Sequence, residues 1–381
     1  MSVGGSSRSP RGFRAFLRAE YPFFIGLTIA SSFLALGNDV LENVGHPFVL
    51  GVTFVLLLGA VLWSAISVVR HADCLAIKCG EPYGTLILTL SAISIEVVMI
   101  SAAMLHGENN PTLARDMMFA VMMIALNGLI GFALLLGGLR HHEQNYNLQG
   151  AGSYLNTIIS LAVLGLVLPN FTTSLAGPRF STVQELFLIV ISLVLYLIFL
   201  FVQTGRHRQY FREAAGAGIR IAGDAHSESE LRSTSFHAVM LALYLIVVIV
   251  LAEKFAIPMD NFIERFGMPQ AFGGAIVAGL VLAPEALSAV KAATRNQLQR
   301  SVNILHGSVL ASIGLTIPAV LIIGMTTNRS VTLGIEGGNL PLLLLTLGAS
   351  IVTFGTGKTN VLQGFIHLVL FAVFLLLIFC P

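Results

Sequence analysis

Long apolar stretches alternate with short polar ones along almost the whole chain. Each apolar stretch has about 18 residues or more, enough for a helix to cross a hydrocarbon layer about 30 Å thick. The pattern therefore predicts an all-α polytopic membrane protein whose polar stretches are loops. The eleven expected helices lie at residues 21–38, 48–69, 84–105, 115–138, 152–173, 183–203, 236–255, 269–292, 302–325, 338–355 and 359–379.

The composition agrees with this class. The chain is 55% hydrophobic and 10% charged, whereas soluble domains are about 25% charged. Its formal net charge is +2 and its basic residues lie in the loops, so we expect the lipid bilayer as its surroundings and no nucleic-acid partner. The three cysteines form neither a disulfide framework nor a zinc motif. We expect no resident cofactor, and the sequence leaves the oligomeric state open.

Loop charges predict the orientation. If the N-terminus is cytoplasmic, 16 of the 21 Lys and Arg residues fall in segments on the inner side and five on the outer side. This split follows the positive-inside rule. Residues 1–20 are then a cytoplasmic tail, and the eleventh helix places the C-terminus outside.

A long polar connection at residues 204–235 divides the chain into two units of five spans. The first unit is 48–203 and the second is 236–379, while residues 21–38 form an extra first helix. Because five is odd, the second unit enters the membrane from the opposite side, which is the inverted-repeat arrangement of many secondary transporters. The connection is interpreted as a solvated cytoplasmic linker. A cation-sensing role is the alternative.

Two glutamates, Glu96 and Glu285, occupy matching places in the two units. Each follows a helix-opening glycine, Gly84 or Gly273, by twelve residues, so the glutamates have the same separation along the chain as the glycines. At 1.5 Å per residue this puts each carboxylate about 18 Å deep, near the bilayer midplane. A carboxylate at this depth is costly and normally functional. Two of them suit a hard metal cation such as Ca²⁺ and can hold protons instead. The alternative is that each glutamate is a structural anchor.

Nearby polar and helix-distorting residues are candidates for supporting the site. Thr89 is two helical turns before Glu96, on the same face. Pro284 removes a backbone donor and so frees a carbonyl, and Gly279 is expected to permit close helix approach. His306 suits proton relay or, equally, a hydrogen bond between helices. The remaining candidates, on the helices that follow each glutamate, are Asn127, Asn303 and Ser308.

Three stretches carry a family resemblance. They are GEPYGTLILTLSAISIEV, LLLGGLRHHEQNYNLQGAGSYLNT with VLGLVLPNFT, and LVLAPEALSAVKAATRNQLQRSVNILHGSVLASIGLTIP. Together they resemble the calcium/cation antiporter superfamily, in particular its calcium/proton exchanger branch and the bacterial antiporters that exchange sodium, potassium or calcium for protons. The resemblance implies that Glu96 and Glu285 bind the transported ion and exchange it for protons. It maps the small polar residue of the following helices onto Asn127 and onto His306 to Ser308.

The expected function is a proton-coupled cation antiporter in a bacterial inner membrane. It exports Ca²⁺, Na⁺ or K⁺ from the cytoplasm in exchange for H⁺ by alternating access at the two-glutamate site, and its C-terminus is periplasmic. A Na⁺/K⁺-selective antiporter without Ca²⁺ transport and a cation channel are the alternatives. No HExxH or GxSxG pattern is present, so we do not expect an enzyme.

Overall fold

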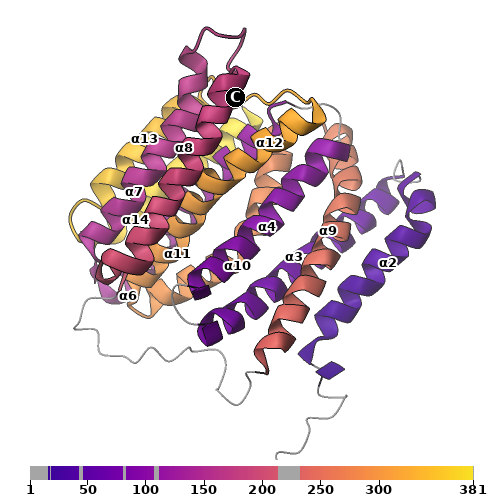
Figure 1. The fold of residues 1–381 in the computed structure, drawn as a ribbon, viewed down its shortest axis with the longest axis horizontal. Helices are drawn as coiled ribbons and strands as arrows, with labels where there is room; N and C mark the ends of the chain where they lie inside the picture. The colour runs from indigo at the N-terminus through magenta and orange to yellow at the C-terminus, as the bar shows by residue number, and fades with distance from the viewer. Residues whose placement is uncertain are drawn as a thin grey trace, which may run out of the picture.

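The computed structural model describes residues 16–17, 19–42, 46–79, 83–106, 111–212 and 232–380. Within these residues the chain forms eleven helical spans (Figure 1), so the predicted fold class and number of spans are confirmed. Eight spans are long and apolar enough to cross a membrane, and shorter apolar helices lie at Tyr21–Ala35, Thr89–Ala102 and Asn339–Thr353. Most of the expected tail and residues 213–231 of the expected linker lie outside the described part.

Of the described spans, seven are continuous α-helices, and four change their helical geometry on the way. The continuous ones are α2 (Tyr21–Glu42), α3 (Pro47–Cys79), α4 (Tyr83–His106), α9 (Thr234–Arg265), α10 (Gln270–Thr294), α13 (Asn339–Thr353) and α14 (Val361–Phe379). The others are α5 (Leu113–Met122), the π-helix η2 (Met123–Leu129) and α6 (Ile130–His141); α7 (Leu148–Ala162) with the π-helix η3 (Val163–Val167) and the 3₁₀ turn η4 (Leu168–Phe171); α8 (Thr182–Phe201) with the π-helix η5 (Val202–Arg206), followed by the 3₁₀ turn η6 (Arg208–Phe211); and α11 (Leu298–Ala311), the π-helix η8 (Ser312–Thr316) and α12 (Ile317–Thr327).

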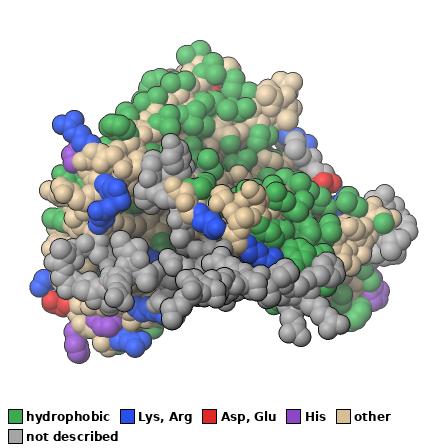
Figure 2. All heavy atoms as spheres, turned by 60° about the horizontal axis from the view of Figure 1, so that its bottom comes forward, with side chains coloured by type: hydrophobic (Ala, Val, Ile, Leu, Met, Phe, Trp, Pro, Cys, Tyr) green, Lys and Arg blue, Asp and Glu red, His purple; other side chains and the backbone are tan. Residues whose placement is uncertain are grey.

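Loops at one end of the bundle are joined by strand pairing and hydrogen bonds. Strand β1 (Gln144–Asn145) pairs antiparallel with β2 (Lys358–Thr359). The Gln144 amide also donates to the carbonyl of Ala293 at 2.8 Å. Figure 2 shows basic and histidine side chains around this end, with apolar side chains on the flanks beyond it.

The opposite end is closed by a buried extended segment, residues 331–335, between α12 and α13. The N–H of Thr332 donates to the carbonyl of Pro111 at 2.8 Å, and that of Gly334 donates to Pro178 at 3.1 Å. The Asn170 amide donates to the carbonyl of Ile335 at 2.5 Å. Most loops are exposed, whereas this buried one is joined to two other loops and to η4. Alternate loops therefore meet at opposite ends, as antiparallel spans require, and Figure 1 shows the C-terminus near its top.

A glycine crossing holds α14 against α6. A Cβ atom at Gly364 would lie 2.6 Å from the backbone nitrogen of Leu135 and 2.9 Å from the carbonyl oxygen of Gly131. No side chain fits in so short a space, so the two backbones are in direct contact. Small residues allow such close packing in lipid. The contact fixes α14 beside η2, which in turn packs against α10.

Two helices are longer than their apolar stretches predict. The spans expected at 48–69 and 236–255 are observed as α3, which reaches Cys79, and α9, which reaches Arg265. Hydropathy detects the part of a helix that lipid surrounds, whereas backbone hydrogen bonds continue the helix into water. The polar turn that begins at Arg70 therefore remains helical.

Candidate functional site

Glu96 lies inside the bundle and bonds to the π-helix η8. Its residue is 2% exposed, and the Ser312 hydroxyl of η8 donates to its Oε2 at 2.5 Å. Thr316, also on η8, lies close enough to interact with the same carboxylate. Among the described residues, however, neither the Thr316 hydroxyl nor Oε1 of Glu96 has a hydrogen-bond partner. The hydrogen bond from Ser312 therefore fixes Oε2 of the carboxylate, while Oε1 can still accept a hydrogen bond or bind a cation.

Glu285 lies on α10, which packs against α4. It is half-buried, and its Oε2 is buried without a partner in the described part of the chain. It interacts electrostatically with Glu96 and with Asp73, an exposed residue of α3. Pro284, directly before it, has no N–H to donate to the carbonyl of Leu280, yet α10 continues through the proline.

These atoms form an oxygen-only set with unused capacity. Each buried polar atom without a partner costs about 1–3 kcal/mol. Two carboxylate oxygens and one hydroxyl carry this cost together, on three neighbouring elements at the centre of the bundle. Carboxylates and hydroxyls are ligands for hard cations, and the carboxylates also accept protons. Among the described residues there is no group of three or more His, Cys, Asp or Glu residues that could hold a metal.

The amide of Asn127 is used elsewhere. It lies on η2, where its nitrogen donates to the Thr346 hydroxyl at 2.8 Å and its oxygen is 3.0 Å from Nδ1 of His367. The other nitrogen of His367 is 3.0 Å from the Thr353 hydroxyl. Asn127 therefore anchors η2 to α13 and α14, and its amide oxygen already has a partner in His367.

The candidates on α11 also have other contacts. His306 is fully buried, with Nδ1 3.1 Å from the carbonyl of Val302, and its ring lies 4.8 Å from that of Phe354. Its Nε2 has no partner within the described residues. Asn303 donates to the carbonyl of Phe211 at 2.6 Å and so holds η6. Ser308 is half-buried one turn before η8. None of these contacts involves Glu96 or Glu285.

Thr89 and Gly279 differ in what they contact. Thr89 interacts with Tyr196 of α8. A Cβ at Gly279 would meet nothing within 4 Å, so the expectation of close helix approach is wrong there. It holds at Gly274, where a Cβ would lie 3.2 Å from the backbone nitrogen of Met117.

The sequence interpretation did not select Ser312 or Thr316 as site residues. It paired the Asn127 turn with the His306 turn, which are closer together in the chain than the two glutamates are. The structure instead begins π-helices at Met123 and Ser312, whose separation along the chain equals that of the glutamates. Thr316 is thus the counterpart of Asn127. The constant offset was the available signal, and π-helical turns are frequent at functional sites.

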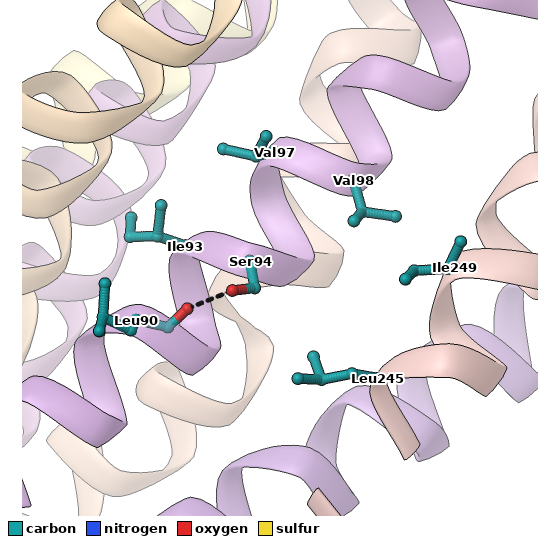
Figure 3. A pocket seen from close by; sticks show the side chains of 7 residues that line it. All are labelled: Leu90, Ile93, Ser94, Val97, Val98, Leu245 and Ile249. Carbon is teal, nitrogen blue, oxygen red and sulfur yellow. Dashed lines mark hydrogen bonds between the residues drawn. The ribbon is translucent and has the colours of Figure 1, made fainter. Parts of the chain in front are cut away.

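An apolar groove between α4 and α9 lies away from this chemistry (Figure 3). It encloses about 450 Å³ and is lined by Leu90, Ile93, Ser94, Val97, Val98, Leu245 and Ile249. Its one polar side chain, Ser94, already donates to the carbonyl of Leu90 at 2.6 Å. An ion would find no free ligand in this groove.

Among the described residues, eleven spans with buried carboxylates on central helices form the architecture of a secondary ion transporter. The family follows from comparison with known proteins. The chain belongs to the sodium/calcium exchanger protein family, whose model matches residues 49–205 and 236–380. This is a family of cation antiporters, and the chain is a multi-pass membrane protein.

Individual relatives agree. The chain is 40% identical over 333 residues to the sodium-potassium/proton antiporter ChaA of Escherichia coli, covering 87% of this chain and 90% of the relative. The solved structure of native YfkE matches with a TM-score of 0.71 at 19% identity, over 94% of this chain and 100% of that one. The H⁺/Ca²⁺ exchanger CAX matches with a TM-score of 0.62 at 15% identity, over 93% and 88%. At these identities the two structures support the fold alone.

Proposed function

We propose that this protein is a proton-coupled cation antiporter in which Glu96 and Glu285 form the exchange site. The observation that carries the proposal is a pair of carboxylate oxygens, Oε1 of Glu96 and Oε2 of Glu285. Both lie on packed helices, α4 and α10, and neither has a hydrogen-bond partner among the residues that the structure describes. A cation bound between them supplies the missing partners. Protons satisfy the same oxygens when the cation leaves, so the two compete for one site.

The transported ion is proposed to be Ca²⁺, Na⁺ or K⁺. Two carboxylates match the charge of one divalent ion, which favours Ca²⁺. The Escherichia coli relative is a sodium-potassium/proton antiporter, which favours the monovalent ions. A relative in Bacillus subtilis, 23% identical over 258 residues, is a Ca²⁺/H⁺ antiporter. Transport of Na⁺ and K⁺ without Ca²⁺ is therefore the second candidate.

Alternating access between two inverted repeats, residues 48–203 and 236–379, is part of the proposal. It is supported by a common offset along the chain, which relates Glu96 to Glu285 and the start of η2 to the start of η8. Each π-helix also packs against the glutamate helix of the other unit, η2 against α10 and η8 against α4. A two-fold axis between the two repeats would produce such a reciprocal pair of contacts.

The end of the bundle that contains β1 and β2 is proposed to face the cytoplasm of a bacterium. Basic side chains gather around that end (Figure 2), which is the arrangement that the positive-inside rule favours. The C-terminus is then periplasmic. Asp73 would attract cations at the cytoplasmic mouth, since it is exposed and interacts electrostatically with Glu285.

The test uses inside-out membrane vesicles with an acid interior and a fluorescent pH probe. Ca²⁺, Na⁺ and K⁺ are added separately between pH 7 and pH 9. We expect at least one cation to collapse the pH gradient. Glu96→Gln and Glu285→Gln should each abolish this response while the protein remains folded.

The matched control is Glu143→Gln, because Glu143 is an exposed carboxylate in a loop, 3.5 Å from Lys358. It should behave as wild type. Robust exchange by either site variant would refute the shared site. Cation flow down its own gradient without any change of pH would instead identify a channel.

A further inference from the structure

A second cluster of buried ionisable groups lies where α2, α3 and α9 meet. Oε2 of Glu20 is 2.6 Å from Nη2 of Arg70, 3.2 Å from Nε2 of His71 and 3.2 Å from the hydroxyl of Tyr244. On its other side, His71 has Nδ1 3.0 Å from Nδ1 of His237. All five are buried except Arg70, which is partly exposed. None of them belongs to the exchange site.

The contact between the two imidazoles holds one proton. At 3.0 Å one Nδ1 must donate and the other must accept. Nε2 of His71 faces both the Glu20 carboxylate, which only accepts, and the Arg70 guanidinium, which only donates. Either assignment of that nitrogen leaves a single hydrogen between the two Nδ1 atoms. If both rings are fully protonated, two N–H groups point at each other and the contact must open.

The groups around Glu20 determine its charge. Burial alone would raise the pKa of Glu20, but its hydrogen bond with His71 and the positive charge of Arg70 outweigh burial and hold this pKa below its usual value. Glu20 therefore stays ionised through the range in which histidines change charge. Asp73, Cys74 and Lys78 of α3 also face this end. Arg232 lies against the rings of Phe16 and Phe236. Glu285 of α10 interacts electrostatically with Asp73. Glu96 on α4 faces η8 instead.

The cluster ties together three helices that form one side of the molecule. Figure 1 shows α2, α3 and α9 side by side on the right, and their mutual contacts agree. Part of α9 is separated from α4 by the apolar groove (Figure 3). The polar contacts at this end join the start of α9 to α3 and tie both helices to Glu20, directly before α2.

We propose that the His71–His237 contact is a pH-responsive latch, closed with one shared proton and opened by a second. In neutral or alkaline cytoplasm the three helices are joined. In acid the α9 end separates from α3. The effect on transport rests on the proposed function: an open latch slows exchange. An antiporter that brings protons into the cell is then restrained when the cytoplasm is already acid.

The direct test measures a distance and needs no transport. Spin labels are placed on Cys79 and on Ser235→Cys, both at exposed positions on α3 and α9, in a background with Cys74→Ala and Cys380→Ala. Pulsed EPR in lipid nanodiscs compares pH 8 with pH 5.5, which lie on either side of the pKa of an unperturbed histidine. We expect a narrow distribution at pH 8 and a longer, broader one at pH 5.5.

The deciding variant is His237→Asn. The asparagine amide occupies nearly the position of Nδ1, keeps one donor–acceptor contact with His71 and does not titrate. Its distance distribution should stay narrow at both pH values. The matched control is His142→Asn, an exposed loop histidine with φ of 63°, a conformation that asparagine adopts readily. This control should respond to pH as wild type does.

The latch is overturned if the wild-type distance does not change with pH, or if His237→Asn changes as much as wild type. Should His237→Asn fail to fold, the wild-type measurement with its His142→Asn control still decides. A second readout is exchange in proteoliposomes, where acid on the cytoplasmic side should slow wild type severalfold and His237→Asn much less. A pH-dependent distance in a protein without exchange activity would sustain the latch and refute the proposed function.

Discussion

Gly364→Ala tests whether the α6–α14 crossing positions the core of the transporter. The added methyl would lie 2.6 Å from the nitrogen of Leu135 and 2.9 Å from the carbonyl oxygen of Gly131, both rigid backbone atoms. Ordinary contact requires the helices to separate by roughly an ångström. Such overpacking costs about 1–3 kcal/mol. His367, one turn later, then moves from Asn127, which weakens a buried 3.0 Å hydrogen bond worth about 1 kcal/mol.

The sum is about 2–4 kcal/mol, so the apparent melting temperature of a chain of this length should fall by roughly 2–5 °C. The assay is thermal unfolding of purified protein in mild detergent, followed by intrinsic fluorescence and by loss of the monodisperse peak in size-exclusion chromatography. Gly348→Ala is the matched control, because a Cβ on this α13 glycine meets nothing within 4 Å, and it should be neutral or slightly stabilising. A Gly364→Ala variant that melts within a degree of wild type would refute the crossing.

Three further outcomes are expected. Ser312→Ala removes a charge-assisted hydrogen bond worth about 1.5–3 kcal/mol from Glu96 and should slow exchange at least severalfold in the vesicle assay, while Ser312→Thr, which keeps the hydroxyl, should be close to wild type. Asp73→Asn should raise the cation concentration for half-maximal exchange without changing the maximal rate, and the effect should shrink at high ionic strength because exposed charges are screened. Glu20→Gln should lower the melting temperature at pH 7, because the folded protein holds the pKa of Glu20 below its usual value. The ionised carboxylate stabilises the fold at any pH above that usual pKa, and this stabilisation is lost as the pH falls through the lower pKa of the folded state. The melting temperatures of the variant and of wild type should therefore converge in acid.

The fold was predictable because lipid imposes one simple rule on the chain. A helix must be apolar over its lipid-crossing length, so each apolar stretch marks a span. The rule does not report where a helix ends in water, which is why the end of α3 at Cys79 was not expected. It also does not report π-helical geometry, because η2 and η8 lie inside apolar stretches that each predict one continuous span.

The candidate site was predictable where a residue is costly in lipid. Glu96 and Glu285 stand out for this reason, whereas Ser312 does not, since a serine in an apolar helix usually bonds to its own backbone. The partners of Asn127 are 219 and 240 residues away in the chain. Only the packing of α13 and α14 against η2 brings them together, and no local pattern encodes that contact.

The buried segment 331–335 determines where the chain tolerates added sequence. Its residues are buried and its backbone joins the loops at Pro111 and Pro178, so a peptide inserted there would pull apart the closed end of the bundle. Residues 173–177 lie at the same end and are exposed. An epitope inserted there should leave the fold intact. Antibody binding to it in whole cells, against permeabilised ones, would then report which side of the membrane this end faces.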